Sequence, residues 1–356
     1  DFKSDDRAVY VADNGKVKKC EANDIMIGRY GASVGQIHRG KAGAYNVALV
    51  KTIPDDSRLN RDYFYYYLTS DLFQKPLMEK SSRGAQDGFN QGDISPFPVP
   101  LPPLEEQQRI VAVLDEAFEG MARARTHAEA NLQNARELFN AELGKVFDVE
   151  LADEDRATFE DITKNTLIGL VRSKKEQGPK RGYDYAKMNN IGNDDRFVGP
   201  VLDRVDCTPE EASRFELLGG DFLFNTRNSR ELVGKSCVVE ADFQRPTVFN
   251  NNVMRVRFSS EVNSRFVALA FKSKLAKAQL EAMKSGTTNV VAIYHKSLKK
   301  LTLPMPSLEA QETLVDRFEE LDAAIQRLIS SYSEQAEDTE DLRQSLLQKA
   351  FAGELT

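Results

Sequence analysis

The sequence contains few of the residues that build disulfide frameworks or metal centres. Its three cysteines are odd in number and far apart, which argues against a disulfide framework and against a four-ligand zinc site. They are Cys20, Cys207 and Cys237. The three histidines, at positions 38, 127 and 295, are not spaced as metal ligands either. We therefore expect no metal on this chain and a reducing cytoplasm as its compartment.

Long hydrophobic runs are also missing. No stretch approaches the roughly 20 apolar residues that a membrane-spanning helix needs, and the first residues do not form a basic-then-apolar leader. Apolar residues make up 41% of the chain, which is enough for ordinary buried cores. We expect a folded chain that does not enter a membrane.

The formal net charge of −7 is unevenly distributed along the chain. Residues 161–307 carry 24 basic and 16 acidic side chains, whereas residues 104–160 carry 6 and 14, and residues 308–356 carry 4 and 12. The basic segment has the charge of a surface that neutralises phosphates. The alternative is that the acidic segments are merely well-solvated helices and that the imbalance is incidental.

An internal repeat dominates the organisation of the chain. The segment Val99-Pro-Leu-Pro-Pro-Leu-Glu-Glu-Gln107 returns, 204 positions later, as Leu303-Pro-Met-Pro-Ser-Leu-Glu-Ala-Gln311, and each copy leads into a long charged segment. The repeat predicts two similar globular units, each followed by a long helix. The predicted parts are a first unit over 1–103, a helix over 104–147, a linker and second unit over 148–307, and a helix with a short tail over 308–356.

Each copy predicts a mixed α/β (α+β) domain. The shared landmark is a strand followed by a glycine-containing turn, at 23–36 and at 220–235, and strands are expected at 247–249 and 253–258. A helix follows in each copy, over 61–69 and over 264–283, and then a polar loop over 81–92 and over 284–295. Asp1 aligns near Gly199, so we expect the first copy to lack about 40 residues that begin the second.

Both long segments carry apolar residues at spacings of three and four, which predicts a coiled coil. One helix over 104–144 would measure about 60 Å at 1.5 Å per residue. Because an apolar stripe needs cover, we expect the two helices to pair antiparallel, giving a pseudo-twofold molecule; separate partners for each helix are the alternative. The predicted pairing residues are Val111, Leu114, Phe118, Met121, Leu132, Phe139, Phe318, Leu321, Ile325, Leu328, Tyr332, Leu342 and Leu346.

Catalytic motifs are not evident. The run from Ser229 to Ser236 ends in Gly-Lys-Ser like a phosphate-binding loop, but Ser229 replaces the glycine that makes the sharp turn, so a basic hairpin is the better interpretation. No Asn-Pro-Pro-Tyr or Asp-Pro-Pro-Tyr stretch offers the base pocket of an amino methyltransferase, and no acidic-then-lysine cluster resembles a nuclease centre. We expect no catalytic residues and no cofactor on this chain.

Side chains suited to DNA cluster in three kinds of segment. A basic loop over 172–183 carries groups that could hold phosphates, and two places in each copy offer arginine and amide groups for base edges. For any single residue, a solvated loop or turn is as good an interpretation as a base contact. The candidates are Arg29, Tyr30, Arg83, Gln86, Asn90, Gln91, Lys174, Lys175, Lys180, Arg181, Tyr183, Arg227, Asn228, Arg230, Thr287, Thr288, Asn289, Tyr294, His295 and Lys296.

These features resemble the DNA specificity subunit of type I restriction–modification systems. The resemblance rests on Pro-Leu-Pro-Pro-Leu-Glu-Glu-Gln-Gln-Arg-Ile at 100–110, on the helix after it, on Gln348-Lys-Ala-Phe-Ala-Gly-Glu-Leu355, and on the strand–turn segments. It covers essentially the whole chain and implies a non-catalytic subunit with two target recognition domains joined by two antiparallel coiled-coil helices. The expected departure from the pattern is an incomplete start of the first domain.

The resemblance also implies partners. Each target recognition domain would read one half of a bipartite, asymmetric site in double-stranded DNA, and the helices would set the spacer and dock two methyltransferase subunits. Restriction and translocase subunits would join indirectly, and S-adenosylmethionine, ATP and Mg would bind to the partner subunits. Two other interpretations remain open: the specificity part of a fused methyltransferase or nuclease, and a coiled-coil scaffold that does not bind DNA.

Overall fold

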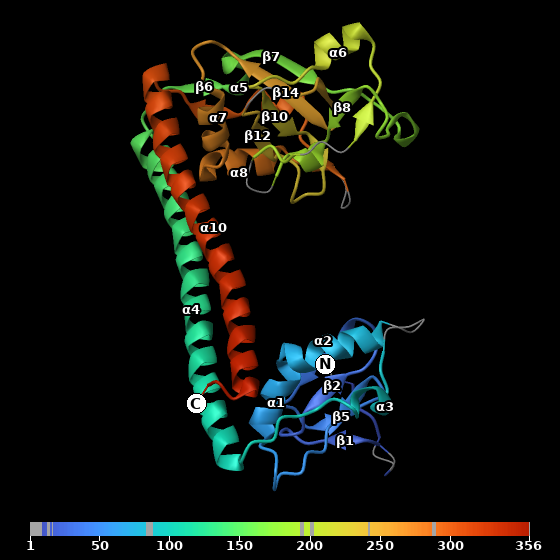
Figure 1. Cartoon of the computed structure of the whole chain (residues 1–356). Coiled ribbons are helices and arrows are strands. Elements are labelled where there is room, and N and C mark those ends of the chain that lie inside the picture. The colour runs from blue at the N-terminus through green and yellow to red at the C-terminus, as the bar shows by residue number, and fades with distance from the viewer. Residues whose placement is uncertain are drawn as a thin grey trace. The chain divides into compact units, whose positions relative to one another are not determined.

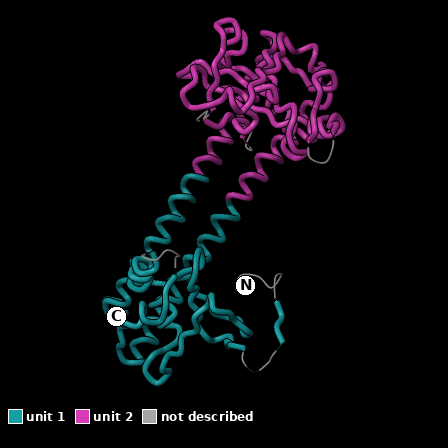
Figure 2. Tube along the Cα trace, turned by 90° about the vertical axis from the view of Figure 1, so that its right-hand side faces the viewer, with its two compact units in different colours: residues 1–131, 329–356 teal, residues 132–328 magenta. Residues whose placement is uncertain are grey.

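The computed structural model describes residues 9–12, 15, 17–82, 88–192, 196–199, 203–240, 243–286 and 290–355. The chain divides into two compact units (Figure 2). Unit 1 comprises residues 1–131 and 329–356, and unit 2 comprises residues 132–328. Each unit therefore contains one globular body and a part of both long helices.

Helices α4 (Leu104–Lys145) and α10 (Leu308–Ala352) begin where the proline-rich repeats end (Figure 1). In unit 1, Ile110 near the start of α4 and Leu347 near the end of α10 belong to one buried cluster. In unit 2 the rings of Phe139, near the end of α4, and Phe318, near the start of α10, lie 5.4 Å apart. The helices are thus antiparallel within each unit, which confirms the predicted pairing.

The central sheet of unit 2 has four antiparallel strands in the order β12-β10-β14-β7. Their bounds are Ser236–Val238, Phe222–Asn225, Val253–Phe258 and Thr163–Ile168. Strand β10 is fully buried because both of its edges are paired and Phe222 and Phe224 pack against helix α7 (Ser264–Phe271). Burial of such aromatic side chains supplies most of the stabilisation of a core.

Shorter elements complete unit 2. In one small sheet, strand β8 lies between β13, which is parallel to it, and β9, which is antiparallel. In a second, β17 pairs with β6, and in a third, β16 lies between β11 and β15. These strands are Tyr183–Ala186, Thr247–Phe249, Arg204–Val205, Thr302–Pro304, Arg156–Thr158, Val291–Ala292, Arg227–Asn228 and Ser285–Gly286. The helices are α5 Phe159–Ile162, α6 Pro209–Phe215, α8 Lys274–Met283 and α9 His295–Leu298, with single turns at Val146–Glu150, Lys174–Glu176 and Met188–Asn190.

Unit 1 repeats this plan with fewer strands among its described residues. Strand β2 lies between β3 and β5, as β10 lies between β12 and β14, and β1 pairs with β4. These strands are Met26–Gly28, Ile37–His38, Leu49–Lys51, Lys19–Cys20 and Gly43–Ala44. Helices α1 (Arg61–Thr69), α2 (Asp71–Ser81) and α3 (Gln91–Ile94) correspond to α7, α8 and α9, and a single turn covers Gly31–Ser33. The repeat of a mixed α/β domain is confirmed.

The predicted helix over 264–283 is two helices, and α2 was not predicted. Ser273 lies between the two helices and is the N-cap of α8: its hydroxyl donates to the Ala270 carbonyl at 2.7 Å, and its oxygen accepts the Ala276 N–H at 3.2 Å. Ser70 stands at the same place between α1 and α2 and donates to the Tyr67 carbonyl. Both serines are buried. A serine that bonds to the preceding turn competes with helix continuation, and apolar periodicity does not reveal this.

Two predicted pairing residues are wrong, because Leu328 and Leu342 are 38% and 53% exposed. In each case the residue that follows the leucine, Ile329 or Arg343, is the partly buried one. Successive residues of a helix lie about 100° apart around its axis, so the buried face is displaced by one residue from the predicted one. The guanidinium of Arg343 lies 5.2 Å from the centre of the Phe118 ring, so a cation covers an apolar surface where the sequence favoured a leucine.

The other predicted pairing residues are buried or partly buried. They are Val111, Leu114, Phe118, Met121, Leu132, Phe139, Phe318, Leu321, Ile325, Tyr332 and Leu346.

A buried glutamine joins each long helix to its globular body. Gln107 is fully buried; its Oε1 accepts the Asn60 N–H at 2.8 Å, and its Nε2 donates to the carbonyls of Arg58 and Pro102 at 2.9 and 2.8 Å. The Asn60 side chain in turn caps helix α1. The helix start, the proline-rich junction and the domain helix are thus linked through one amide.

Gln311 makes the same contacts in unit 2. Its Oε1 accepts the Asn263 N–H at 2.9 Å, and its Nε2 donates to the carbonyls of Glu261 and Pro306. Asn263 caps helix α7 as Asn60 caps α1. The repeated Gln at the end of the junction motif is therefore a structural residue in both copies.

We predict that Gln107→Ala destabilises unit 1 by about 1–3 kcal/mol, because the backbone groups of Asn60, Arg58 and Pro102 lose a hydrogen-bond partner beside a buried side chain. Gln108→Ala, one residue along and exposed, is the matched control and should change stability by less than about 0.5 kcal/mol. Thermal unfolding followed by circular dichroism, with hydrogen exchange to locate the destabilised region, measures the effect. Equal stability of the two variants would contradict the role assigned to Gln107.

Candidate nucleic-acid interface

In unit 2 the fold brings together the two segments predicted to read bases. Strand β11 pairs antiparallel with β16, so that Arg227 lies opposite Ala292 and Asn228 opposite Val291. The contact is extended by the Ile293 N–H, which donates to the Thr226 carbonyl at 3.0 Å. The Arg227 side chain is exposed and Asn228 is partly buried. Segments more than sixty residues apart in sequence therefore form one surface.

Unit 1 has the same arrangement. Tyr30 and Gly88 form an antiparallel bridge, and Arg29 Nε donates to the Phe89 carbonyl at 2.6 Å. The Arg29 guanidinium lies 4.9 Å from the centre of the Tyr30 ring, which is 45% exposed. A Cβ at position 88 would lie 2.8 Å from the Tyr30 ring, so this close approach requires glycine. The loop pairing is thus built into both copies.

One candidate in these segments has a structural role, and three others are exposed. Asn90 is the N-cap of α3 and accepts the Gly92 N–H at 2.8 Å, while Gln91 beside it is exposed. Tyr294 precedes α9 and is 56% exposed, and Lys296 is exposed.

His295 lies 3.2 Å, Nε2 to Oγ1, from Thr166 of strand β7. Burial, and then the nearby Lys299, hold the pKa of His295 below its ordinary value, so the ring is neutral at pH 7. A neutral, hydrogen-bonded imidazole cannot contribute a positive charge to a phosphate contact.

The basic loop over 172–183 is partly neutralised by carboxylates of the same unit. Arg172 pairs with Glu211 and Arg181 with Asp206, both at 2.6 Å. Among the described residues Lys174, Lys175 and Lys180 form no ion pair and are exposed, whereas Tyr183 is partly buried in strand β8. The three lysines are therefore the available cations of this loop.

Arg230 is also engaged, because it forms an ion pair with Glu281 of helix α8. Lys284, which follows that helix, donates to the Arg230 carbonyl at 2.6 Å and so ties the end of α8 to the loop after β11. Lys284 is not among the residues predicted from the sequence, because its contact with Arg230 joins residues 54 positions apart. Arg83, Gln86, Thr287, Thr288 and Asn289 lie outside the described residues.

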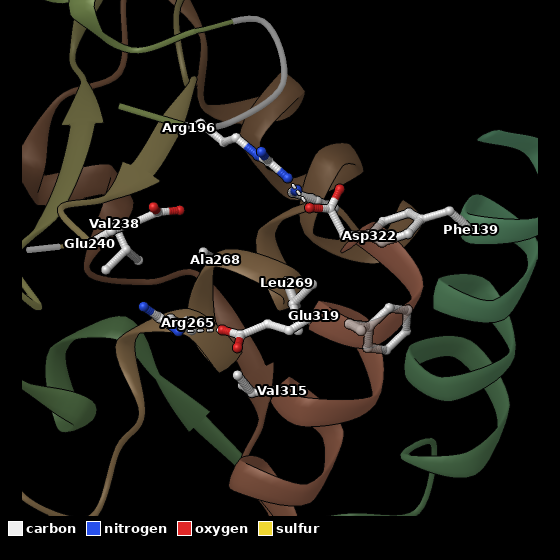
Figure 3. Close-up of a pocket in the computed structure, with 12 residues that line it drawn as sticks. Phe139, Arg196, Val238, Glu240, Arg265, Ala268, Leu269, Val315, Glu319 and Asp322 are labelled. Carbon is white, nitrogen blue, oxygen red and sulfur yellow. Dashed lines mark hydrogen bonds and ion pairs between the residues drawn. The ribbon is translucent and has the colours of Figure 1, made fainter. Parts of the chain in front are cut away.

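A cavity of about 130 Å³ lies in unit 2 beside α10 (Figure 3). Its apolar wall includes Phe318 and Leu269, and Arg196 and Arg265 cross it to reach Asp322 and Glu319 of α10. The described residues that line it include no serine, cysteine or histidine. Its ion pairs thus link α10 to the globular body of unit 2, and its described lining offers no hydroxyl, thiol or imidazole group.

The described ranges contain neither a candidate metal centre nor a candidate membrane span. In them, no group of three or more histidine, cysteine or acidic side chains is placed to hold a metal ion. Within the same ranges, no helix has the length and apolar character that crossing a membrane requires.

The comparisons with known proteins point to one family. The family model described as type I restriction modification DNA specificity domain matches residues 10–127 and 163–335. The specificity subunit of the type I restriction enzyme EcoKI, from Escherichia coli (strain K12), is 23% identical over 312 residues, which is 83% of this chain and 65% of that protein. The chain thus aligns with slightly less than two thirds of that relative's length.

A second relative is also a specificity subunit, and two solved structures have a similar fold. The MjaVIII specificity subunit of Methanocaldococcus jannaschii is 22% identical over 353 residues, covering 94% of this chain and 79% of that protein. A chain from a structure on complex assembly and conformational transition of the type I R-M system is 18% identical, with a TM-score of 0.77 over 95% of this chain and 84% of that chain. The crystal structure of the HsdS subunit from Thermoanaerobacter tengcongensis is 17% identical, with a TM-score of 0.58, and the match covers 94% of this chain and 82% of that chain.

The two structures, at such low identity, show the fold alone. The family model, however, covers well over half of the residues and both copies of the repeat. This chain therefore belongs to the family of type I restriction modification DNA specificity domains.

Proposed function

We propose that this chain is a DNA-reading specificity subunit in which each unit reads one half of a bipartite, asymmetric site. The observation that carries the proposal is the loop pairing found in both copies, Arg29 and Tyr30 against 88–89 and Arg227 and Asn228 against 291–292. The side chain of Arg227 is exposed, and an exposed arginine can reach the O6 and N7 atoms of guanine, as an amide can reach adenine. Membership in a DNA specificity family supports the same conclusion.

The helices suit a second role, the docking of two methyltransferase subunits. The segments 104–160 and 308–356 carry an excess of acidic side chains, which fits contact with protein better than contact with phosphates. In this proposal the chain is non-catalytic and acts in the cytoplasm, and restriction and translocase subunits join indirectly. S-adenosylmethionine, ATP and Mg are bound by the partner subunits.

We predict that Arg227→Ala changes recognition in one half-site only. The chain is co-expressed with a partner methyltransferase subunit, and the methylated sites are mapped. With the wild-type chain, the methylated sites should share a two-part motif. With the variant, one base position in one half of that motif should no longer be specified, and the free energy of DNA binding should weaken by about 1–3 kcal/mol. Methylation by the chain alone would instead favour a fused enzyme, and no retention on DNA even with the partner would favour a scaffold.

Replacement of Lys174, Lys175 and Lys180 by Gln should weaken binding to all duplexes, because the proposed partners of these lysines are phosphates. The slope of log affinity against log salt should fall by about one for each phosphate that is no longer neutralised. Arg181→Gln is the matched control, since its guanidinium is already paired with Asp206 and should affect the slope less. A weakening confined to one base pair would contradict the assignment.

Shortening both helices by one heptad should shift the spacer of the recognised site. Deleting 122–128 from α4 and 331–337 from α10 removes about 10 Å from each helix, or about three base pairs at 3.4 Å per pair. Both half-sites should stay unchanged in the methylation map. The control removes 122–128 alone, which breaks the helix register and should cost stability. An unchanged spacer in the paired deletion would refute the role of the helices as a ruler.

A further inference from the structure

A second cavity of unit 2, of about 320 Å³, is lined by four lysines and two glutamates. They are Lys235, Lys272, Lys277, Lys284, Glu231 and Glu281. Val233, Phe271 and Leu280 form its apolar part. The lining comes from the loop before β12, from the end of α7 and from α8 with the residue after it. An excess of positive charge beside apolar surface strengthens attraction for an anion, because solvent screening is reduced there.

The two carboxylates do not cancel this charge. Glu281 is shared by Lys284, at 2.7 Å, and by Arg230, and these two cations hold its pKa below the ordinary value. Hydrogen bonds also hold the pKa of Glu231 below its ordinary value, so it is ionised at pH 7 and the lining is two charges positive. Lys235 and Lys272 have contacts within the protein. Lys277 is exposed and forms no ion pair with any residue that the structure describes.

The cavity adjoins the proposed base-reading surface. The loop that begins after β11 carries Glu231, Val233 and Gly234 into the cavity wall, and Lys284 and Glu281 bind Arg230 in that loop. The base-reading Arg227 and the cavity are thus connected by a few residues held to helix α8. In duplex DNA, phosphates flank every base edge, so a protein that reads bases at Arg227 needs a phosphate partner nearby.

The Gly234-Lys235-Ser236 sequence lines this cavity but does not form a nucleotide cradle. It leads into strand β12 rather than a helix, and the Gly234 N–H already donates to the Asn225 carbonyl at 2.9 Å. Ser236 lies opposite Phe224 in the sheet. A phosphate-binding loop works through free backbone N–H groups at a helix start, and this segment precedes a strand instead. The lysine side chains remain as the recognising groups.

We propose that this cavity binds a phosphate group, supplied by the DNA backbone beside the half-site that unit 2 reads. The assignment rests on the proposed function. Lys277 supplies the free ammonium group, and Lys284 positions the loop that follows strand β11, in which Arg227 lies. The contact holds unit 2 in register on the duplex and carries no sequence information of its own.

The test compares Lys277→Gln with Lys274→Gln in the full chain. Lys274 is exposed on the same helix, one turn earlier, and does not line the cavity. Binding to a duplex with the mapped site is measured over a range of salt concentrations. Lys277→Gln should lower the salt slope by about one and leave the recognised sequence unchanged, and Lys274→Gln should lower it less. Equal slopes for the two variants would overturn the proposal.

Duplexes with single neutral methylphosphonate linkages locate the partner phosphate. A neutral linkage at one position should weaken binding by the wild-type chain and should not weaken binding by Lys277→Gln any further. If no linkage behaves in this way, the assignment is overturned. It is also overturned if inorganic phosphate or ATP raises the melting temperature of the wild-type chain but not of Lys277→Gln, while the two chains bind the duplex equally well. Failure of the wild-type chain to bind any duplex, even with its methyltransferase partner, would instead refute the proposed function itself.

Discussion

Gln107 and Gln311 are the points on which both units depend, because each is a buried amide that hydrogen-bonds three backbone groups of the junction. The amide links the proline-rich junction, the first turn of a long helix and the N-cap asparagine of a domain helix. A buried unpaired N–H or carbonyl costs more than one hydrogen bond gains, so these contacts specify the geometry of the junction more than they add stability. The repeat of the motif is therefore a repeat of one structural joint.

The joint sets the direction in which each long helix leaves its domain, while the sheet positions the proposed base-reading surface. Strands β2 and β10 are each the centre of a small antiparallel sheet, and the loops that follow them are held by the segment before the last short helix. The joint and the reading loops are built from different segments of each domain. In the proposed function, this separation allows bases, phosphates and partner proteins to be contacted by different surfaces of one domain.

Much of this arrangement could be predicted from the spacing of apolar residues, and the failures have identifiable causes. The bounds of α1, β13 and β14 follow from periodicity and turn residues. The break at Ser273 does not, since a serine hydroxyl competing for a helix carbonyl leaves the apolar pattern intact. The stripe of α10 passes through Ile329 and Arg343 because packing, rather than the nearest leucine, decides which face is covered.

By itself the sequence determined the repeat, the two long helices, the division of charge and the kinds of side chain suited to DNA. It could not determine which cations are available. Arg181 and Arg230 were predicted candidates and Lys277 was not, yet carboxylates distant in sequence pair with both arginines, while Lys277 forms no ion pair with the residues described. Only the tertiary structure decides such pairings, because the energy of a charge depends on its neighbours in space and on its exposure to water.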